Sequence, residues 1–119
     1  MNADLTVRVR REPGYAVVTV TGEIDIATVA MVRESLNMLA ESGLPVIADL
    51  DQVGFMDASG LGAIVGASRR AAAHGASLHV VCDGRTRRLF QLAGLDRQVP
   101  LARTMGEALR GLPDGPPGT

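Results

Sequence analysis

The spacing of apolar residues changes repeatedly along this chain between a strand-like period of two and a helix-like period of three to four, and this alternation restricts the fold most. Leu5, Val7 and Val9 alternate with polar residues, as in a strand that is buried on one face. Apolar residues within 27–42 instead recur along one helical face. The pattern predicts, in order, a strand from residue 5, a strand over 15–21, a helix over 27–42, a strand over 46–50, a helix over 59–74, a strand over 77–82, a helix over 86–92, an edge strand over 98–102 and a helix over 104–112.

Regular alternation of strands and helices is typical of a largely parallel sheet whose strands are joined by right-handed crossovers. Turn residues at 12–14 separate the first two strands, which we expect to form a hairpin at one edge of the sheet. Because 119 residues are the length of one domain, we predict a single α/β domain over residues 1–112, with about five mostly parallel strands and about four helices. Residues 113–119 hold three prolines and two glycines, so this segment is predicted to be a flexible tail.

Composition and charge exclude several classes of function. The 12 basic residues, all of them arginine, are balanced by 13 acidic residues, which leaves no positive excess for neutralising nucleic-acid phosphates. Cys82 is the single cysteine, so the chain has neither an internal disulfide nor a pair of thiols for a metal or redox site. The polar N-terminus and the lack of a long apolar run predict a cytoplasmic protein that does not span a membrane.

Two predicted loops, over 22–25 and 52–59, follow strands and precede helices, which is where parallel sheets commonly carry functional groups. In the second loop, the run Phe-Met-Asp-Ala-Ser-Gly-Leu-Gly over 55–62 places an acid and a hydroxyl at the start of a helix. Asp57 and Ser59 are both residue types that cap helix N-termini, and capping alone would account for them. A helix N-terminus also tolerates a phosphate, so the Ser59 hydroxyl is a candidate modification site as well.

The same loop fits enzymatic sites less well. Gly60 and Gly62 do not make a phosphate-binding loop, because such a loop needs a following lysine and this chain has none. The spacing around Ser59 differs from the Gly-x-Ser-x-Gly turn of serine hydrolases, and His74 lies at the far end of the predicted helix. An aspartyl-phosphate receiver also requires a lysine. We therefore predict a protein that is not an enzyme and that needs no cofactor or metal.

Other residues are expected to have structural roles. His79 lies within a predicted strand and should be a packed or hydrogen-bonded core residue. The arginines at 69–70 and 85–88 are expected on solvated helix faces. The stripe predicted to be buried on the helix over 59–74 consists of Leu61, Ile64, Val65, Ser68 and Ala72.

Three segments of the sequence resemble the STAS domain proteins, and among them the bacterial anti-sigma factor antagonists. Gly22-Glu23-Ile24-Asp25 is similar to the family's Gly-Glu-(Leu/Ile)-Asp turn. The run over 55–62 resembles its Met-Asp-(Ser/Ala)-Ser-Gly-Leu-Gly signature, and residues 88–90 with 94–95 are similar to its late helix and turn. The resemblance covers about residues 4–112 and implies a STAS-like fold.

The resemblance also implies a regulatory switch. The unmodified antagonist binds an anti-sigma factor that is also a serine kinase and thereby frees a sigma factor. The kinase phosphorylates the serine before Gly-Leu-Gly, here Ser59, and a serine phosphatase restores it. Many family members have two serines in a row where this chain has Ala58 and Ser59, so a second minor acceptor is missing. The residues expected to form the partner-binding surface are Glu23, Asp25, Asp57, Ala58, Ser59, Gly60 and Leu61.

A second hypothesis comes from family members that lack the serine and serve as scaffold or lipid-transport subunits. On that hypothesis the chain is a STAS subunit of a transporter or signalling assembly and is not phosphorylated. The presence of Ser59 argues against it. Neither hypothesis involves direct contact with nucleic acid.

Overall fold

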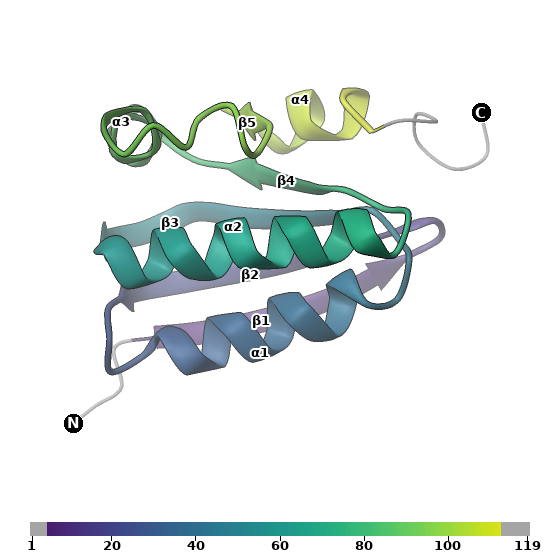
Figure 1. Ribbon diagram of the computed structural model, residues 1–119, viewed down its shortest axis with the longest axis horizontal. Helices are drawn as coiled ribbons and strands as arrows, with labels where there is room; N and C mark the ends of the chain where they lie inside the picture. Colours follow the sequence, from purple (N-terminus) through teal and green to yellow (C-terminus); the bar gives the residue numbers. More distant parts are fainter. Residues whose placement is uncertain (1–4, 113–119) are drawn as a thin grey trace.

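An antiparallel hairpin of β1 (Leu5–Glu12) and β2 (Tyr15–Ile24) forms one edge of the sheet (Figure 1). The computed structural model describes residues 5–112, so the predicted tail over 113–119 lies outside the described residues. The turn between the two strands contains Gly14 with φ of 88°, a conformation that residues with a Cβ rarely adopt. The hairpin at the sheet edge is therefore confirmed.

The remaining strands are parallel, and the chain alternates between strand and helix after the hairpin. The elements are α1 (Val29–Ala40), β3 (Val46–Met56), α2 (Ala58–Ala73), β4 (Leu78–Val81), α3 (Gly84–Leu92), β5 (Leu101–Ala102) and α4 (Met105–Arg110). The strands lie in the order β1-β2-β3-β4-β5, with parallel pairing from β2 to β5. This confirms the predicted class, an α/β fold with five mostly parallel strands and four helices.

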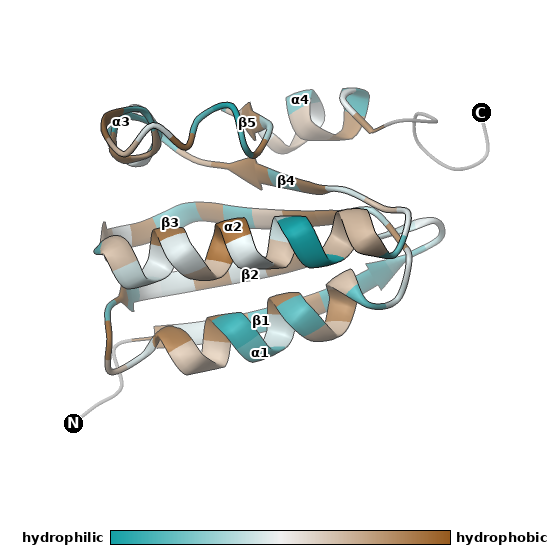
Figure 2. Ribbon diagram, viewed as in Figure 1, coloured by the Kyte–Doolittle hydropathy of each residue, from teal (hydrophilic) through white to brown (hydrophobic). Residues whose placement is uncertain are grey.

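Helices cover both faces of the sheet. Successive residues of a strand point to opposite sides, so β2 contributes side chains to a buried cluster on each face. Val18 of β2 lies in one buried cluster with Leu36 of α1 and Ile64 of α2. Its neighbour Val17 lies in a second cluster with Ala108 of α4, on the other side of the sheet. Figure 2 shows apolar residues in β4 and along parts of β3, whereas α1 alternates between apolar and hydrophilic residues, as expected for a helix with one buried side.

Two strands are longer than the sequence pattern predicts. The segment 52–57, predicted as a loop, is strand as far as Met56, and β2 continues through the predicted loop at 22–25 to Ile24. The two extensions pair with each other, with Gly22 opposite Val53 and Ile24 opposite Met56. Cross-strand pairing therefore overrides the turn-like composition of both segments. The predicted strand over 98–102 is shorter than expected, because only its last two residues pair with β4.

The buried side of α2 agrees with the predicted stripe in its first half. Leu61, Ile64 and Val65 are buried. Near the end of the helix, Ala71 is buried and Ala72 is exposed, so the prediction is wrong by one residue there. Spacings of three and four residues fit either Ala71 or Ala72 as the next buried position, and the packing of the helix against the sheet decides between them.

His79 is a buried strand residue, as predicted, with its Nε2 atom 2.9 Å from the Ser77 hydroxyl oxygen. Burial lowers the pKa of His79, because the charged imidazolium loses its water. The unfolded chain therefore binds a proton on this residue at a higher pH than the folded chain does. The free energy of unfolding should fall as the pH is lowered from about 6.5 toward the folded pKa, and His79 should have no effect on its pH dependence at higher pH.

Urea unfolding between about pH 5.5 and 7.5 checks this prediction. The variant His79→Gln should lose part of the pH dependence of the unfolding free energy. The matched control is His74→Gln, which makes the same substitution at an exposed histidine. Equal pH dependence in His79→Gln and the unmodified chain would show that His79 does not titrate differently in the two states.

Candidate functional site

The site lies at the carboxyl end of β3, where Asp57 begins α2. Asp57 is the N-cap residue, with extended φ and ψ of -101° and -172°. Its Oδ1 atom accepts hydrogen bonds from the Ser59 backbone N–H at 2.9 Å and from the Ser59 hydroxyl at 2.5 Å. Of the two candidate caps, Asp57 therefore caps the helix, and Ser59 places its hydroxyl beside the capping carboxylate in a half-buried position.

The two loops singled out in the sequence meet at this point. The Asp57 N–H donates to the Ile24 carbonyl oxygen at 3.1 Å, which joins the ends of β3 and β2. In the turn after β2, the Asp25 carboxylate accepts hydrogen bonds from the backbone N–H groups of Ala27 at 2.9 Å and Thr28 at 3.1 Å. Asp25 thus fixes the turn that leads into α1, while Ser59 lies in the first turn of α2, which follows the neighbouring strand β3.

Asp57 places a carboxylate directly beside the Ser59 hydroxyl. The Ser59 hydroxyl, followed by the backbone N–H groups of Ser59, Gly60 and Ile26, stabilises the carboxylate and lowers the pKa of Asp57 below its usual value. Asp57 is therefore ionised at neutral pH. A phosphate on Ser59 would add about 1.5 to 2 negative charges next to this carboxylate.

Five of the seven predicted site residues are at least partly exposed, and two are buried. Glu23 and Ala58 are exposed, and Asp25, Asp57 and Ser59 are half-buried. By contrast, Gly60 is buried and the Leu61 side chain is only 8% exposed, so these two support the loop from beneath.

Gly60 is required by packing, because there is no room for a side chain at this position. A Cβ atom there would lie 2.5 Å from Cγ of Met56 and 2.9 Å from Cγ2 of Ile24. At Gly62, one half-turn further along α2, a Cβ atom would meet nothing within 4 Å. The two glycines that could have suggested a phosphate-binding loop therefore have different environments, and Gly60 belongs to the core below Ser59.

Two exposed apolar side chains beside this site were not predicted from the sequence. Ile26 follows Asp25 and is 79% exposed, and Phe55 precedes Met56 in β3 and is 52% exposed. Water-exposed apolar side chains next to a polar loop are typical of protein-binding surfaces. The sequence did hold a signal, since Phe55 is a large apolar residue in the motif over 55–62 and Ile26 directly follows the motif over 22–25.

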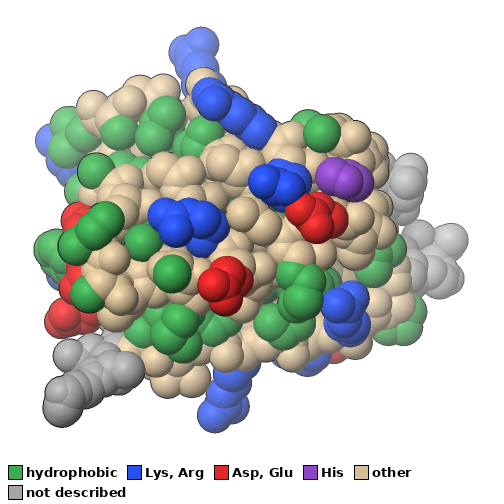
Figure 3. All heavy atoms as spheres, turned by 60° about the horizontal axis from the view of Figure 1, so that its bottom comes forward, with side chains coloured by type: hydrophobic (Ala, Val, Ile, Leu, Met, Phe, Trp, Pro, Cys, Tyr) green, Lys and Arg blue, Asp and Glu red, His purple; other side chains and the backbone are tan. Residues whose placement is uncertain are grey.

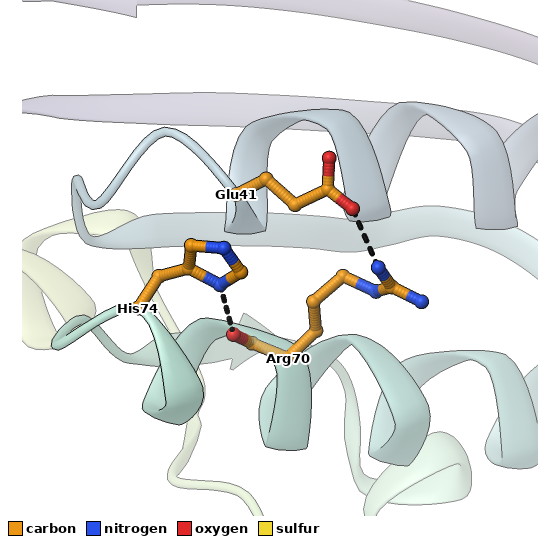
Figure 4. Close-up of polar contacts among 3 residues, drawn as sticks. All are labelled: Glu41, Arg70 and His74. Carbon is orange, nitrogen blue, oxygen red and sulfur yellow. Dashed lines mark hydrogen bonds and ion pairs between the residues drawn. The ribbon is translucent and has the colours of Figure 1, made fainter.

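At the end of α2 that is far from Ser59, polar contacts join α2 to the residue that follows α1. Arg70 of α2 forms an ion pair with Glu41 at 2.5 Å, and the His74 Nδ1 atom lies 2.9 Å from the Arg70 carbonyl oxygen (Figure 4). Figure 3 shows the molecule turned so that the lower side of Figure 1 comes forward, with charges of both signs scattered among hydrophobic side chains.

Within residues 5–112, no three His, Cys, Asp or Glu side chains are grouped to hold a metal ion. None of the described helices is long and apolar enough to cross a membrane.

Comparison with known proteins gives one consistent result. The STAS domain family model matches residues 6–108. The anti-sigma-F factor antagonist RsfB of Mycobacterium tuberculosis is 34% identical over 113 residues, which cover 93% of this chain and 92% of that protein. The anti-sigma-B factor antagonist of Bacillus subtilis is 34% identical over 77% of this chain and 85% of its own length. The crystal structure of an anti-sigma factor antagonist from Mycobacterium paratuberculosis is 29% identical and superimposes with a TM-score of 0.83, over 91% of this chain and 93% of that one.

Proposed function

The chain belongs to the STAS domain family, and we propose that it is an anti-sigma factor antagonist controlled by phosphorylation of Ser59. In its unmodified form it binds an anti-sigma factor that is also a serine kinase, and this binding frees a sigma factor. Antagonists of this family are regulatory binding proteins and not enzymes, so no residue of this chain is given a catalytic role. The observation that supports the proposal best is the Ser59 hydroxyl at the start of α2, which is half-buried and donates a hydrogen bond to the Asp57 carboxylate.

In the proposed switch, the kinase transfers the γ-phosphoryl group of ATP to the Ser59 oxygen and releases ADP, and the hydroxyl proton leaves. A phosphate can be accommodated at this position because backbone N–H groups in the first turn of α2 favour negative charge. The same phosphate lies beside the ionised Asp57 carboxylate, so it changes the charge of the docking surface without unfolding the domain. A serine phosphatase removes it and restores binding.

Intact mass measurement tests the modification directly. After incubation with the partner kinase and ATP, the protein should gain the mass of one phosphate, and Ser59→Ala should gain none. Ala58 offers no hydroxyl, so the expected product carries a single phosphate in this loop. A gain of phosphate in Ser59→Ala would place the acceptor elsewhere, and no gain in either protein would favour an unphosphorylated scaffold subunit.

A pull-down from a lysate of the source organism identifies the partner. Ser59→Ala and Ser59→Asp serve as paired baits, because they differ by one charge at the switch position. An anti-sigma factor retained by Ser59→Ala and lost from Ser59→Asp would support both the partner and its control. Recovery of no anti-sigma factor with either bait would contradict the proposed function.

A further inference from the structure

The strand that ends at the Ser59 loop extends well beyond its neighbour in the sheet. β3 pairs with β4 only from Val46 to Asp49, whereas its pairing with β2 continues to Met56. Over residues 50–56, therefore, β3 has a strand on one side and none among the described residues on the other. In Figure 1 this end of β3 projects past the tip of β4 toward α3. A free strand edge presents backbone N–H and C=O groups to which another extended chain can bind.

A hollow of about 170 Å³ lies along this free edge, between β3 and α3. The residues around it are Val53, Gly54, Phe55, Met56, Arg85, Thr86 and Leu89. Its lining is mostly apolar, and the exposed Phe55 ring stands at its border. The hollow is therefore suited to an aliphatic side chain carried by a segment that lies along β3.

Gly54 lies at an irregularity of the β2–β3 pairing, because Gly22 pairs with Val53 and Glu23 pairs with Phe55. Its φ is not in the left-handed region, so the backbone conformation does not demand glycine. A Cβ atom at Gly54 would meet nothing within 4 Å, so internal packing does not demand it either. Glycine weakens a strand interior and often marks a bulge or a place where another backbone approaches closely. The irregular pairing accounts for a glycine at this position, and the open space beside Gly54 leaves the strand accessible to an incoming backbone.

Arg85 supplies the only charged group around the hollow. It is exposed in the first turn of α3, where the helix dipole disfavours a cation. The ion pairs within 4 Å among residues 5–112 are Arg10 with Glu12 and Arg70 with Glu41, so the Arg85 guanidinium makes no such pair. A carboxylate on an incoming segment would be complementary to it.

We propose that an extended segment of the anti-sigma factor adds to the free edge of β3 as a further strand, with an aliphatic side chain in the hollow and a carboxylate against Arg85. This inference rests on the proposed function and names the chemistry of the partner at the same site. The edge is continuous with the switch, because Met56 is followed directly by the cap Asp57 and then by Ser59. A segment bound along residues 50–56 would therefore end beside the Ser59 hydroxyl, where a phosphate would meet it.

Two variants test the edge without changing Ser59. Gly54→Val adds a side chain to a residue that lines the hollow, where a Cβ atom would meet nothing within 4 Å, so it should fold normally while obstructing a segment bound along β3. Arg85→Glu reverses the charge at the border of the hollow. The control is Thr6→Val, which adds a similar apolar group at an exposed position of β1, on the opposite edge of the sheet.

The probe is the anti-sigma factor recovered with Ser59→Ala, purified and titrated by calorimetry. Gly54→Val and Arg85→Glu should each bind it at least about tenfold more weakly than the unmodified protein, and Thr6→Val should bind equally well. Amide hydrogen exchange of residues 50–56 should also slow in the complex, as expected for backbone groups that gain hydrogen bonds.

Each other outcome overturns a defined part of the proposal. If the anti-sigma factor binds, but Gly54→Val and Arg85→Glu bind as tightly as the unmodified protein, the edge is not the docking site and the switch at Ser59 still stands. If no anti-sigma factor is recovered at all, the proposed function fails and this inference fails with it. If sedimentation shows a dimer that Gly54→Val dissociates, a second copy of the chain is the occupant of the edge and the anti-sigma factor is not.

Discussion

Ser59→Asp should bind the anti-sigma factor roughly a hundredfold more weakly than Ser59→Ala, which corresponds to a coupling of about 3 kcal/mol. The added carboxylate lies next to Asp57, whose lowered pKa keeps it ionised, so two like charges occupy the surface that the partner covers. Ser59→Ala removes the hydroxyl and adds no charge, and should bind about as well as the unmodified protein. Isothermal titration calorimetry with the purified anti-sigma factor measures the difference.

The matched control adds the same charge at another helix start. Thr104 caps α4 through its hydroxyl, which accepts from the Glu107 N–H at 3.1 Å, and aspartate is an equally good cap. Thr104→Asp should therefore fold normally and bind the anti-sigma factor unchanged. The loss in Ser59→Asp should shrink as salt is raised, because part of it is repulsion between exposed charges. Equal affinities for Ser59→Ala and Ser59→Asp would contradict the phosphorylation switch.

The periodicity of apolar residues was sufficient to predict the fold class, because burial against one core imposes the pattern on every element. The hairpin at 5–21, the alternating strands and helices and the buried face of the first half of α2 all follow from local spacing. The lengths of β2 and β3 do not follow from it. Gly22 and Gly54 look like turn residues in isolation, but the two segments pair with each other, with Gly22 opposite Val53 and Gly54 at an irregularity of the pairing.

The site was predictable in its chemistry and less so in its surroundings. Asp57 and Ser59 are cap residue types at the start of an apolar helix, so their place at a helix N-terminus could be read from the sequence. Which of them caps the helix, and that the other bonds to the cap, depends on the backbone angles at Asp57. The exposure of Ile26 and Phe55 depends on tertiary packing, which leaves them at the surface beside Ser59.

The two glycines that follow Ser59 allow a test of the packing below the switch. Gly60→Ala should destabilise the protein by about 1 to 3 kcal/mol, because its methyl group would collide with Met56 and Ile24 and force both core side chains to move. Gly62→Ala makes the same chemical change two residues later, where the methyl group meets nothing within 4 Å. It should stabilise α2 by up to about 1 kcal/mol, since alanine has the higher helix propensity.

Urea unfolding of the two variants measures both effects, and their opposite signs separate packing from helix propensity. Met56 and Ile24 end the two strands that carry the Ser59 and Asp25 loops, so a shift of these side chains should also move the switch. Gly60→Ala is therefore expected to weaken binding of the anti-sigma factor as well as the fold. If Gly60→Ala left the unfolding free energy unchanged or raised it, as Gly62→Ala should, then Gly60 would not be closing the core beneath Ser59, and the support assigned to it there would be wrong.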